Sequence, residues 1–213
     1  MQNTSHAVMA QRSEPIDSPD DFPTPPWATR AFLEHVLPKG RDYSVQTCLE
    51  PACGAGHMAK VLREGFGEVR ASDAYCYGYG SVRDFLSVPY EAKSVDWVIT
   101  NPPFRLAEEF VSRGLLVARQ GVAVLVRTVF LESVGRYNRL FEPCPPSVFA
   151  QYVERVPMVK GRLDAKATTA TGYAWLLWDH QSSGEPRVVW IPPCRKSLEK
   201  LTDYPSNQGR LKF

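Results

Sequence analysis

Alternating strand and helix signals over residues 45–127 restrict the fold of this chain more than any other feature. Four apolar segments have the length and composition of buried strands: VQTCLE (45–50), EVRASD (68–73), VDWVIT (95–100) and VAVLVR (122–127). Apolar residues at helical spacing, such as Met58, Val61 and Leu62, lie between them. This alternation predicts a mostly parallel, doubly wound α/β sheet with helices on both faces.

The same pattern divides the 213 residues into one domain and two flanking segments. Residues 1–21 are polar without apolar periodicity, so we expect a flexible N-terminal arm. The domain is expected at 22–194, because this length suits a single α/β unit. After Phe130 further strand signals follow, and we expect an antiparallel C-terminal strand and candidate substrate-recognition elements at 130–170. Residues 195–213 are predicted to form a basic tail.

Composition excludes several classes of protein. No stretch approaches the roughly 20 apolar residues that span a bilayer, and the N-terminus lacks the apolar core of a secretory signal. The five cysteines show no C-x-x-C pair, and the four histidines do not cluster with them. We therefore expect a cytoplasmic protein with reduced thiols, no membrane partner and no metal site.

Positive charge is unevenly distributed, although the net charge is only +2. Residues 127–166 contain seven basic and four acidic side chains, and residues 195–213 contain five basic and two acidic ones. Clustered positive charge favours contacts with phosphate groups. From charge alone a solvated surface is the better interpretation, so these segments indicate nucleic acid only together with other signals.

The segment LEPACGAGHM (49–58) is typical of a ligand-binding loop at a strand-to-helix junction. Gly54 and Gly56 allow the backbone to turn sharply and to approach a ligand closely. The loop lacks both the G-x-G-x-x-G pattern and the P-loop lysine, and Glu50 at the strand end would repel a phosphate. A carboxylate there suits a cationic zwitterion such as S-adenosylmethionine, which carries a sulfonium and an amino group.

Acidic residues further along the chain fit the same ligand. Asp73 ends the next strand, where an acid commonly accepts hydrogen bonds from ribose hydroxyls. Asp84 can accept a hydrogen bond from an adenine amino group while Phe85 stacks on the ring. Each feature alone is a weak signal, and their order and spacing carry the prediction.

Asn101-Pro102-Pro103-Phe104 directly follows the strand at 95–100, so we expect it at the carboxyl edge of the sheet. The prolines fix the backbone and can aim carbonyl oxygens rigidly. An exocyclic amino nitrogen such as adenine N6 is a poor nucleophile, because its lone pair is delocalised into the ring. The Asn101 side-chain oxygen and the Pro102 carbonyl are candidate acceptors that draw this nitrogen toward tetrahedral geometry. Phe104 would stack on a flipped-out base.

These motifs, in this order, resemble the S-adenosylmethionine-dependent amino-methyltransferases of the DNA N6-adenine type, above all their compact phage-encoded members. The matching segments are FPTPPWATRAFL (22–33), LEPACGAG (49–56), SD (72–73), RDF (83–85) and NPPF (101–104). The resemblance implies a Rossmann-like class I methyltransferase fold, S-adenosylmethionine as cofactor, DNA as substrate and a bacterial or phage-infected cell as the setting.

The resemblance also implies roles for the matching residues. The cofactor-binding residues would be Thr24, Pro25, Trp27, Glu50, Pro51, Cys53, Gly54, Ala55, Gly56, Asp73, Asp84 and Phe85, and the catalytic residues Asn101, Pro102, Pro103 and Phe104. Thr24 as a helix cap and Trp27 as a core residue are the structural alternatives. No separate target-recognition domain follows, so the candidate substrate contacts are Arg136, Arg139, Arg155, Lys160, Arg162 and Lys166, for which surface charge is the alternative.

Three other functions compete with DNA methylation. Amino-methylation of adenine or guanine in RNA uses the same chemistry. Glutamine N5-methylation of a protein is a second rival, although its N-P-P loop usually ends in Tyr and an extra helical domain usually precedes it. A degenerate binding module predicts loss of Glu50, Asp73 or Asn101, and all three are present. The sequence predicts neither the target site nor the oligomeric state.

Overall fold

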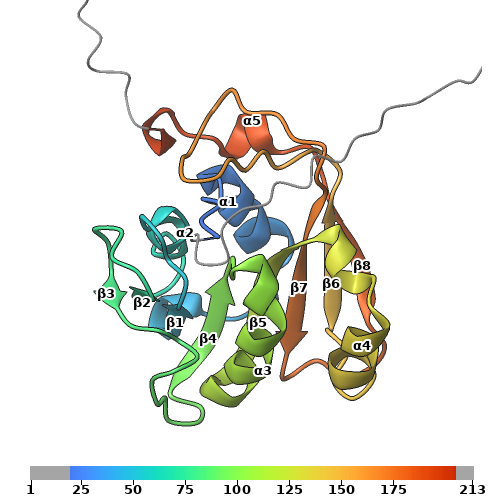
Figure 1. Ribbon diagram of the computed structural model, residues 1–213. Coiled ribbons are helices and arrows are strands. Elements are labelled where there is room, and N and C mark those ends of the chain that lie inside the picture. The colour runs from blue at the N-terminus through green and yellow to red at the C-terminus, as the bar shows by residue number, and fades with distance from the viewer. Residues whose placement is uncertain (1–19, 205–213) are drawn as a thin grey trace, which may run out of the picture.

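An eight-stranded sheet is the centre of the computed structural model, which describes residues 20–204 (Figure 1). The strands are β1 (Thr47–Glu50), β2 (Glu68–Asp73), β3 (Ser81–Val82), β4 (Val95–Thr100), β5 (Ala118–Arg127), β6 (Val148–Tyr152), β7 (Tyr173–Asp179) and β8 (Arg187–Ile191). The α-helices are α1 (Pro26–His35), α2 (His57–Leu62), α3 (Ala107–Val117), α4 (Val134–Arg136) and α5 (Arg195–Leu198). Short 3-10 or π segments are η1 (Tyr43–Val45), η2 (Phe104–Leu106), η3 (Thr128–Leu131), η4 (Tyr137–Phe141) and η5 (Leu201–Asp203).

The strand order is β3-β2-β1-β4-β5-β7-β6-β8. Strands β1 to β5 pair in parallel, as do β6 and β8, whereas β7 runs antiparallel to both β5 and β6. The expected mostly parallel α/β sheet with an antiparallel C-terminal strand is therefore confirmed. The strand order reverses between β1 and β4, and open α/β sheets bind ligands at the carboxyl ends of the strands beside such a switch.

Helices cover both faces of the sheet and bury a hydrophobic core on each. On one face, α1 and α2 contribute Trp27, Phe32 and Leu62 to the core. On the other face, α3 contributes Phe110 and Val111, and Figure 1 shows α3 in front of β4 and β5. Alternate residues of β4 enter the two cores, which explains why this segment reads as continuously apolar in the sequence.

The boundaries of several elements differ from the sequence expectation. The strand expected at 45–50 begins at Thr47, because Asp42 accepts a hydrogen bond from the backbone N–H of Ser44 (3.0 Å) and caps the one-turn helix η1 just before it. The short strand β3 has no counterpart among the strands expected from the sequence. Between β5 and β6 the chain forms α4 and the π-helical η4.

All of the expected domain at 22–194 lies within the described residues, whereas most of the expected N-terminal arm and part of the basic tail lie outside them. The segment between β6 and β7 is a long loop with one isolated bridge between Val159 and Arg162. No helix among residues 20–204 combines the length and apolar character needed to cross a bilayer. The same residues contain no group of three or more His, Cys, Asp or Glu that could hold a metal ion.

Candidate functional site

A cavity of about 220 Å³ opens at the carboxyl ends of β1, β2 and β4. Its lining includes Asp20, Asp21, Phe22, Thr24, Glu50, Pro51, Cys53, Gly54, Ala55, His57, Asp73, Tyr75, Tyr77, Asp84, Phe85, Asn101 and Pro103. Parallel strands that end at one edge bring these residues together from distant parts of the sequence. The cavity therefore unites most of the residues predicted to bind the cofactor with Asn101, the first residue of the predicted catalytic loop (101–104).

Five carboxyl side chains line the cavity: Asp20, Asp21, Glu50, Asp73 and Asp84. No lysine or arginine among residues 20–204 lines it. The one imidazole, His57, has its pKa lowered by burial and by Lys60, which favours its neutral form. Such a lining attracts a cationic ligand and disfavours a phosphate.

Glu50 at the end of β1 is the most deeply buried of these acids, with 2% of its surface exposed. Its Oε2 atom has no hydrogen-bond partner within the described residues. Burial and the neighbouring Asp73 raise the pKa of its carboxyl well above the usual value. A buried acceptor without a partner costs free energy, so this site favours a ligand that brings a positive charge or a hydrogen-bond donor.

Asp73 at the end of β2 shapes the glycine loop across from it. Its Oδ2 accepts a hydrogen bond from the backbone N–H of Gly54 (2.9 Å), and its Oδ1 accepts one from the backbone N–H of Tyr75 (3.0 Å). Gly54 takes φ +48°, a left-handed conformation that favours glycine. A carboxylate has about four lone-pair sites, so Asp73 can still accept hydrogen bonds from a ligand.

Asp84 and Phe85 lie on the cavity wall but are also held by local structure. Asp84 accepts hydrogen bonds from the backbone N–H of Leu86 (2.9 Å) and from the Ser87 hydroxyl. The bond from Ser87 is the main reason why the pKa of Asp84 is lowered. Phe85 is 1% exposed and packs against Tyr90 and Phe110. Both residues therefore support the fold as well as the cavity.

Asn101 presents a hydrogen-bond acceptor on the cavity wall. Its Nδ2 donates to the backbone oxygen of Phe22 (2.9 Å) and to the Thr24 hydroxyl oxygen (3.1 Å). Because a backbone carbonyl can only accept, these contacts fix which end of the amide is which. The Asn101 Oδ1 is buried and has no partner within the described residues. The oxygen thus lacks the hydrogen-bond partner that a donor on a ligand would supply.

Phe104 lies beside the cavity rather than among its lining residues. Its backbone N–H donates to Asp20 (2.7 Å), and its ring contacts Phe22 (centroids 5.3 Å apart). The guanidinium of Arg127, at the end of β5, lies 3.9 Å from the centroid of the Phe104 ring. This cation–π contact joins the catalytic loop to the neighbouring strand.

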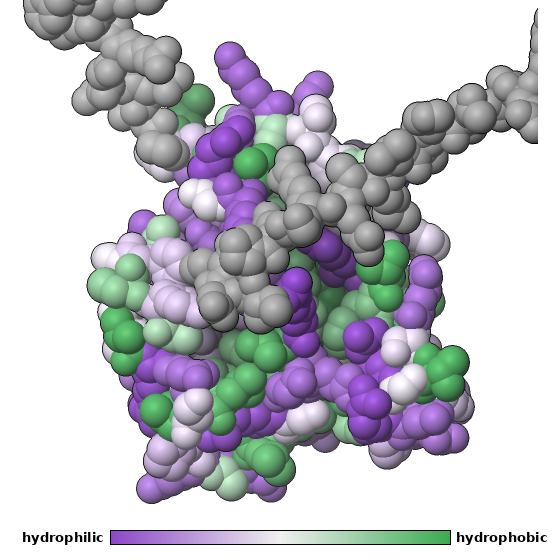
Figure 2. Space-filling view, viewed as in Figure 1, coloured by the Kyte–Doolittle hydropathy of each residue, from purple (hydrophilic) through white to green (hydrophobic). Residues whose placement is uncertain are grey.

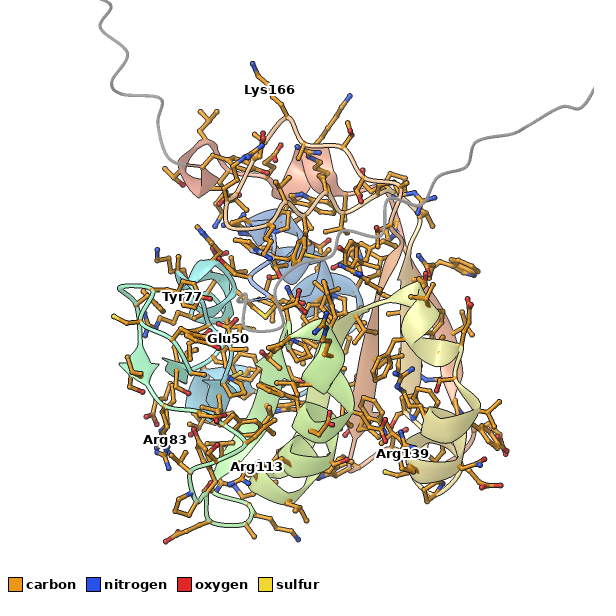
Figure 3. The ribbon with its side chains drawn as sticks, in the orientation of Figure 1. Glu50, Tyr77, Arg83, Arg113, Arg139 and Lys166 are labelled. Carbon is orange, nitrogen blue, oxygen red and sulfur yellow. The ribbon has the colours of Figure 1, made fainter. Side chains whose placement is uncertain are left out.

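Several residues of this site were not predicted from the sequence. Asp20 and Asp21 belong to a segment expected to be a flexible arm, yet both line the cavity. Tyr77 also lines the cavity and was not predicted. Burial, together with Asp21 and Asp73, raises the pKa of its hydroxyl group to about 12. Figure 3 shows Tyr77 and Glu50 close together in this view, above the carboxyl end of the sheet. The run of aromatic residues at 75–79 was the available signal for the tyrosines, and local sequence offered none for the acids.

Some predicted site residues lie elsewhere. The cavity lining does not include Pro25, Trp27, Gly56 or Pro102. Trp27 is fully buried in the core, where its ring makes an edge contact with Tyr152 (5.9 Å). Trp27 therefore lies where the structural alternative, a core residue, places it.

The predicted substrate contacts do not form one cluster. Arg136 and Arg139 both pair with Glu108, and Arg136 also stacks on Phe130 at 3.9 Å. In the long loop, Arg162 pairs with Asp164 (3.4 Å). Figure 3 shows Lys166 and Arg139 at widely separated places, both distant from Glu50. The Nη1 atom of Arg155 lies beside Gly172, the residue that precedes β7.

Binding of a cation to this cavity is expected to release a proton from Glu50. The raised pKa favours the protonated form of the carboxyl in the ligand-free protein, and a nearby positive charge lowers that pKa again. Affinity therefore rises with pH up to the raised pKa. In the ligand-free protein, stability falls with pH over the window between the ordinary and the raised pKa, because only the folded state still holds the proton. Calorimetry with S-adenosylmethionine in buffers of different ionisation enthalpy measures this proton, and Glu50→Gln should abolish its release.

Replacing Gly56 with alanine is expected to destabilise the protein by about 2 kcal/mol or more. Gly56 caps α2 with φ +82°, and an added Cβ would lie 2.3 Å from the ring of Tyr79. Gly78→Ala is the matched control, since Gly78 has φ +76° with no atom within 4 Å of the added Cβ. Urea denaturation of both variants separates the steric cost from the conformational one. Equal losses of stability would contradict the predicted steric contribution.

Comparison with known proteins shows similarity at the level of the fold. No protein-family model and no curated protein matches the sequence. The protein assigned as the modification subunit of a type I restriction enzyme from Vibrio vulnificus YJ016 superposes with a TM-score of 0.56 at 18% identity, over 80% of this chain and 47% of that one. The protein assigned as a class I S-adenosylmethionine-dependent methyltransferase from Listeria monocytogenes superposes with a TM-score of 0.54 at 13% identity, over 79% of this chain and 65% of that one. This chain thus spans less than two thirds of either structure, and its sheet is that of the class I methyltransferase fold.

Proposed function

We propose that this chain is an S-adenosylmethionine-dependent methyltransferase that methylates an exocyclic amino nitrogen, adenine N6 in DNA. The observation that carries the proposal is the buried, unpartnered Asn101 Oδ1 on the wall of a cavity whose charged side chains are carboxylates. The carboxylates fit a sulfonium and an ammonium group, and the oxygen fits an amino group. The fold shared with class I methyltransferases supports the same assignment.

The cofactor would occupy the acidic part of the cavity. Glu50 and the loop from Cys53 to Gly54 would face its amino-acid and sulfonium end, where Glu50 Oε2 lacks a partner. Asp73 would accept hydrogen bonds from the ribose, and Phe85 would contact the adenine. When bound, S-adenosylmethionine supplies an electrophilic methyl group.

The residues of the catalytic loop would act by positioning. Asn101 Oδ1 accepts a hydrogen bond from the amino group of the target base, and the Pro102 carbonyl is the second candidate acceptor. Two such bonds favour a tetrahedral nitrogen with its lone pair available for the new N–C bond. The nitrogen then loses one of its protons to solvent, so a strong general base is not required.

DNA is the proposed substrate on two grounds. One neighbour with the same fold is assigned as the modification subunit of a restriction enzyme. The guanidinium of Arg127 lies against Phe104, where a flipped base would enter. RNA and a glutamine side chain of a protein are the competing substrates.

Transfer of a tritiated methyl group from S-adenosylmethionine tests the proposal. We expect labelling of unmethylated DNA well above tRNA, ribosomal RNA and release factor, with N6-methyladenine as the product after digestion. Labelling of RNA or protein alone would replace the DNA assignment by one of its rivals. Failure to bind S-adenosylmethionine in calorimetry would refute the cofactor as well.

A further inference from the structure

Most arginines of the described chain are neutralised or held by local acceptors. Eight of them form ion pairs with carboxylates: Arg30, Arg41, Arg70, Arg119, Arg136, Arg139, Arg162 and Arg195. Three more donate hydrogen bonds to backbone oxygens: Arg63, Arg83 and Arg113. Within residues 20–204, four arginines have neither kind of contact: Arg105, Arg127, Arg155 and Arg187.

Three of these four arginines, Arg105, Arg127 and Arg155, lie at or just after the carboxyl ends of β4, β5 and β6. Arg105 follows Phe104 directly and is exposed. Arg127 stacks on the Phe104 ring at 3.9 Å, and its Nε is buried without a partner. Arg155 reaches Gly172, whose backbone oxygen accepts a hydrogen bond from Thr128, the residue after Arg127. The carboxyl ends of β4, β5 and β6 and the start of antiparallel β7 thus place three cations at one edge of the sheet.

Tyr173 connects two of these cations. It is the register partner of Arg127 in the β5–β7 pair, and its ring lies 6.2 Å from that of Phe104. Tyr173 and Arg155 both line a pocket of about 190 Å³. Two acids lie near these cations. Asp20 accepts a hydrogen bond from the N–H of Phe104, and Glu154 lines the pocket beside Arg155 and accepts hydrogen bonds from the backbone N–H groups of Cys194 and Arg195. Within the described residues, neither acid forms an ion pair with Arg105, Arg127 or Arg155.

We propose that Arg105, Arg127 and Arg155 form a phosphate-binding lip that receives the DNA backbone on the Phe104 side of the cavity. The inference rests on the proposed function and adds the route by which the substrate enters. Guanidinium groups suit this role, because they bind phosphate oxygens in a bidentate manner and stack on aromatic rings. The acidic interior and the basic lip would then separate the cationic cofactor from the anionic substrate. In Figure 2 the exposed apolar residues of the visible face are scattered among hydrophilic ones, which agrees with a polar partner.

Salt-dependent binding of a short fluorescent DNA duplex tests the lip. The slope of log K against log salt is negative, and each lost phosphate contact should reduce its magnitude by about 0.9. We therefore expect Arg127→Gln/Arg155→Gln to reduce this magnitude by about 2 and to weaken binding about 100-fold at low salt. Arg187→Gln is the matched control, because Arg187 begins β8 and lies at the opposite edge of the sheet. It should change neither quantity.

Two further variants keep the test decisive. Arg127→Lys retains the charge and loses the planar stack, so it should keep the slope. If Arg127→Gln does not fold, Arg105→Gln/Arg155→Gln carries the same expectation, because both side chains are exposed.

A wild-type slope and affinity in a charge-neutralised double variant that still binds S-adenosylmethionine would overturn the lip, even if the enzyme methylates DNA. Lip-dependent binding of RNA but not of DNA would overturn the choice of partner. A protein that binds DNA through the lip yet transfers no methyl group would refute the proposed function and leave the lip intact.

Discussion

Asn101→Ala is expected to lower the single-turnover rate of methyl transfer by about 100- to 1000-fold, the usual loss when a preorganised polar group is removed from a reacting centre. The variant lacks the buried Oδ1 atom that would hold the target amino group. Affinity for S-adenosylmethionine should change little, because the acidic residues that would face the cofactor remain. Rapid-quench measurement with tritiated cofactor gives the rate, and calorimetry gives the affinity.

The asparagine variant needs a control for its structural role. Asn101 Nδ2 also holds the Phe22 backbone and the Thr24 hydroxyl, so its loss should cost about 1 to 3 kcal/mol of stability. Thr24→Val removes the hydroxyl partner and keeps the Asn101 oxygen, so it should lose stability with a much smaller loss of rate. Asn138→Ala, at an exposed asparagine of η4, should change neither quantity. A normal rate in Asn101→Ala would contradict the amino-nitrogen mechanism.

Local pattern was sufficient to predict the strands and the residues at their carboxyl ends. Glu50, Asp73 and Asn101 each follow or end an apolar segment, and parallel topology brings such positions to one edge. The same reasoning placed Gly54 in a turn, where φ is +48°. These predictions succeed because each depends on one strand and the turn after it.

Contacts between distant segments explain what the sequence did not reveal. Asp20 binds Phe104 across 84 positions in the chain, and Arg127 reaches the same ring from another strand. Neither contact leaves a period or motif in the local sequence. Polar composition at 1–21 predicted flexibility, whereas Asp20 and Asp21 are held by the catalytic loop and by the N–H of Gly161 (2.8 Å).

Asp73→Ala is expected to weaken binding of S-adenosylmethionine by about 100-fold or more, since two hydrogen bonds to a charged group contribute about 1.5 to 3 kcal/mol each. The substitution removes the acceptor for the N–H groups of Gly54 and Tyr75, so the glycine loop loses the anchor that sets its shape. It also removes the candidate partner of the ribose hydroxyls. Calorimetric titration measures the loss of affinity.

Comparison of two substitutions separates the shape of the loop from the charge of the site. Asp73→Asn keeps one side-chain oxygen acceptor without the negative charge, so it should recover part of the affinity that alanine loses. Asp42→Ala is the matched control, because Asp42 accepts a hydrogen bond from Ser44 in a similar turn outside the cavity. It should leave affinity unchanged. If Asp73→Ala bound the cofactor as tightly as the wild type, the acidic cavity would not be the cofactor site, because the carboxylate that holds its glycine loop would then be dispensable.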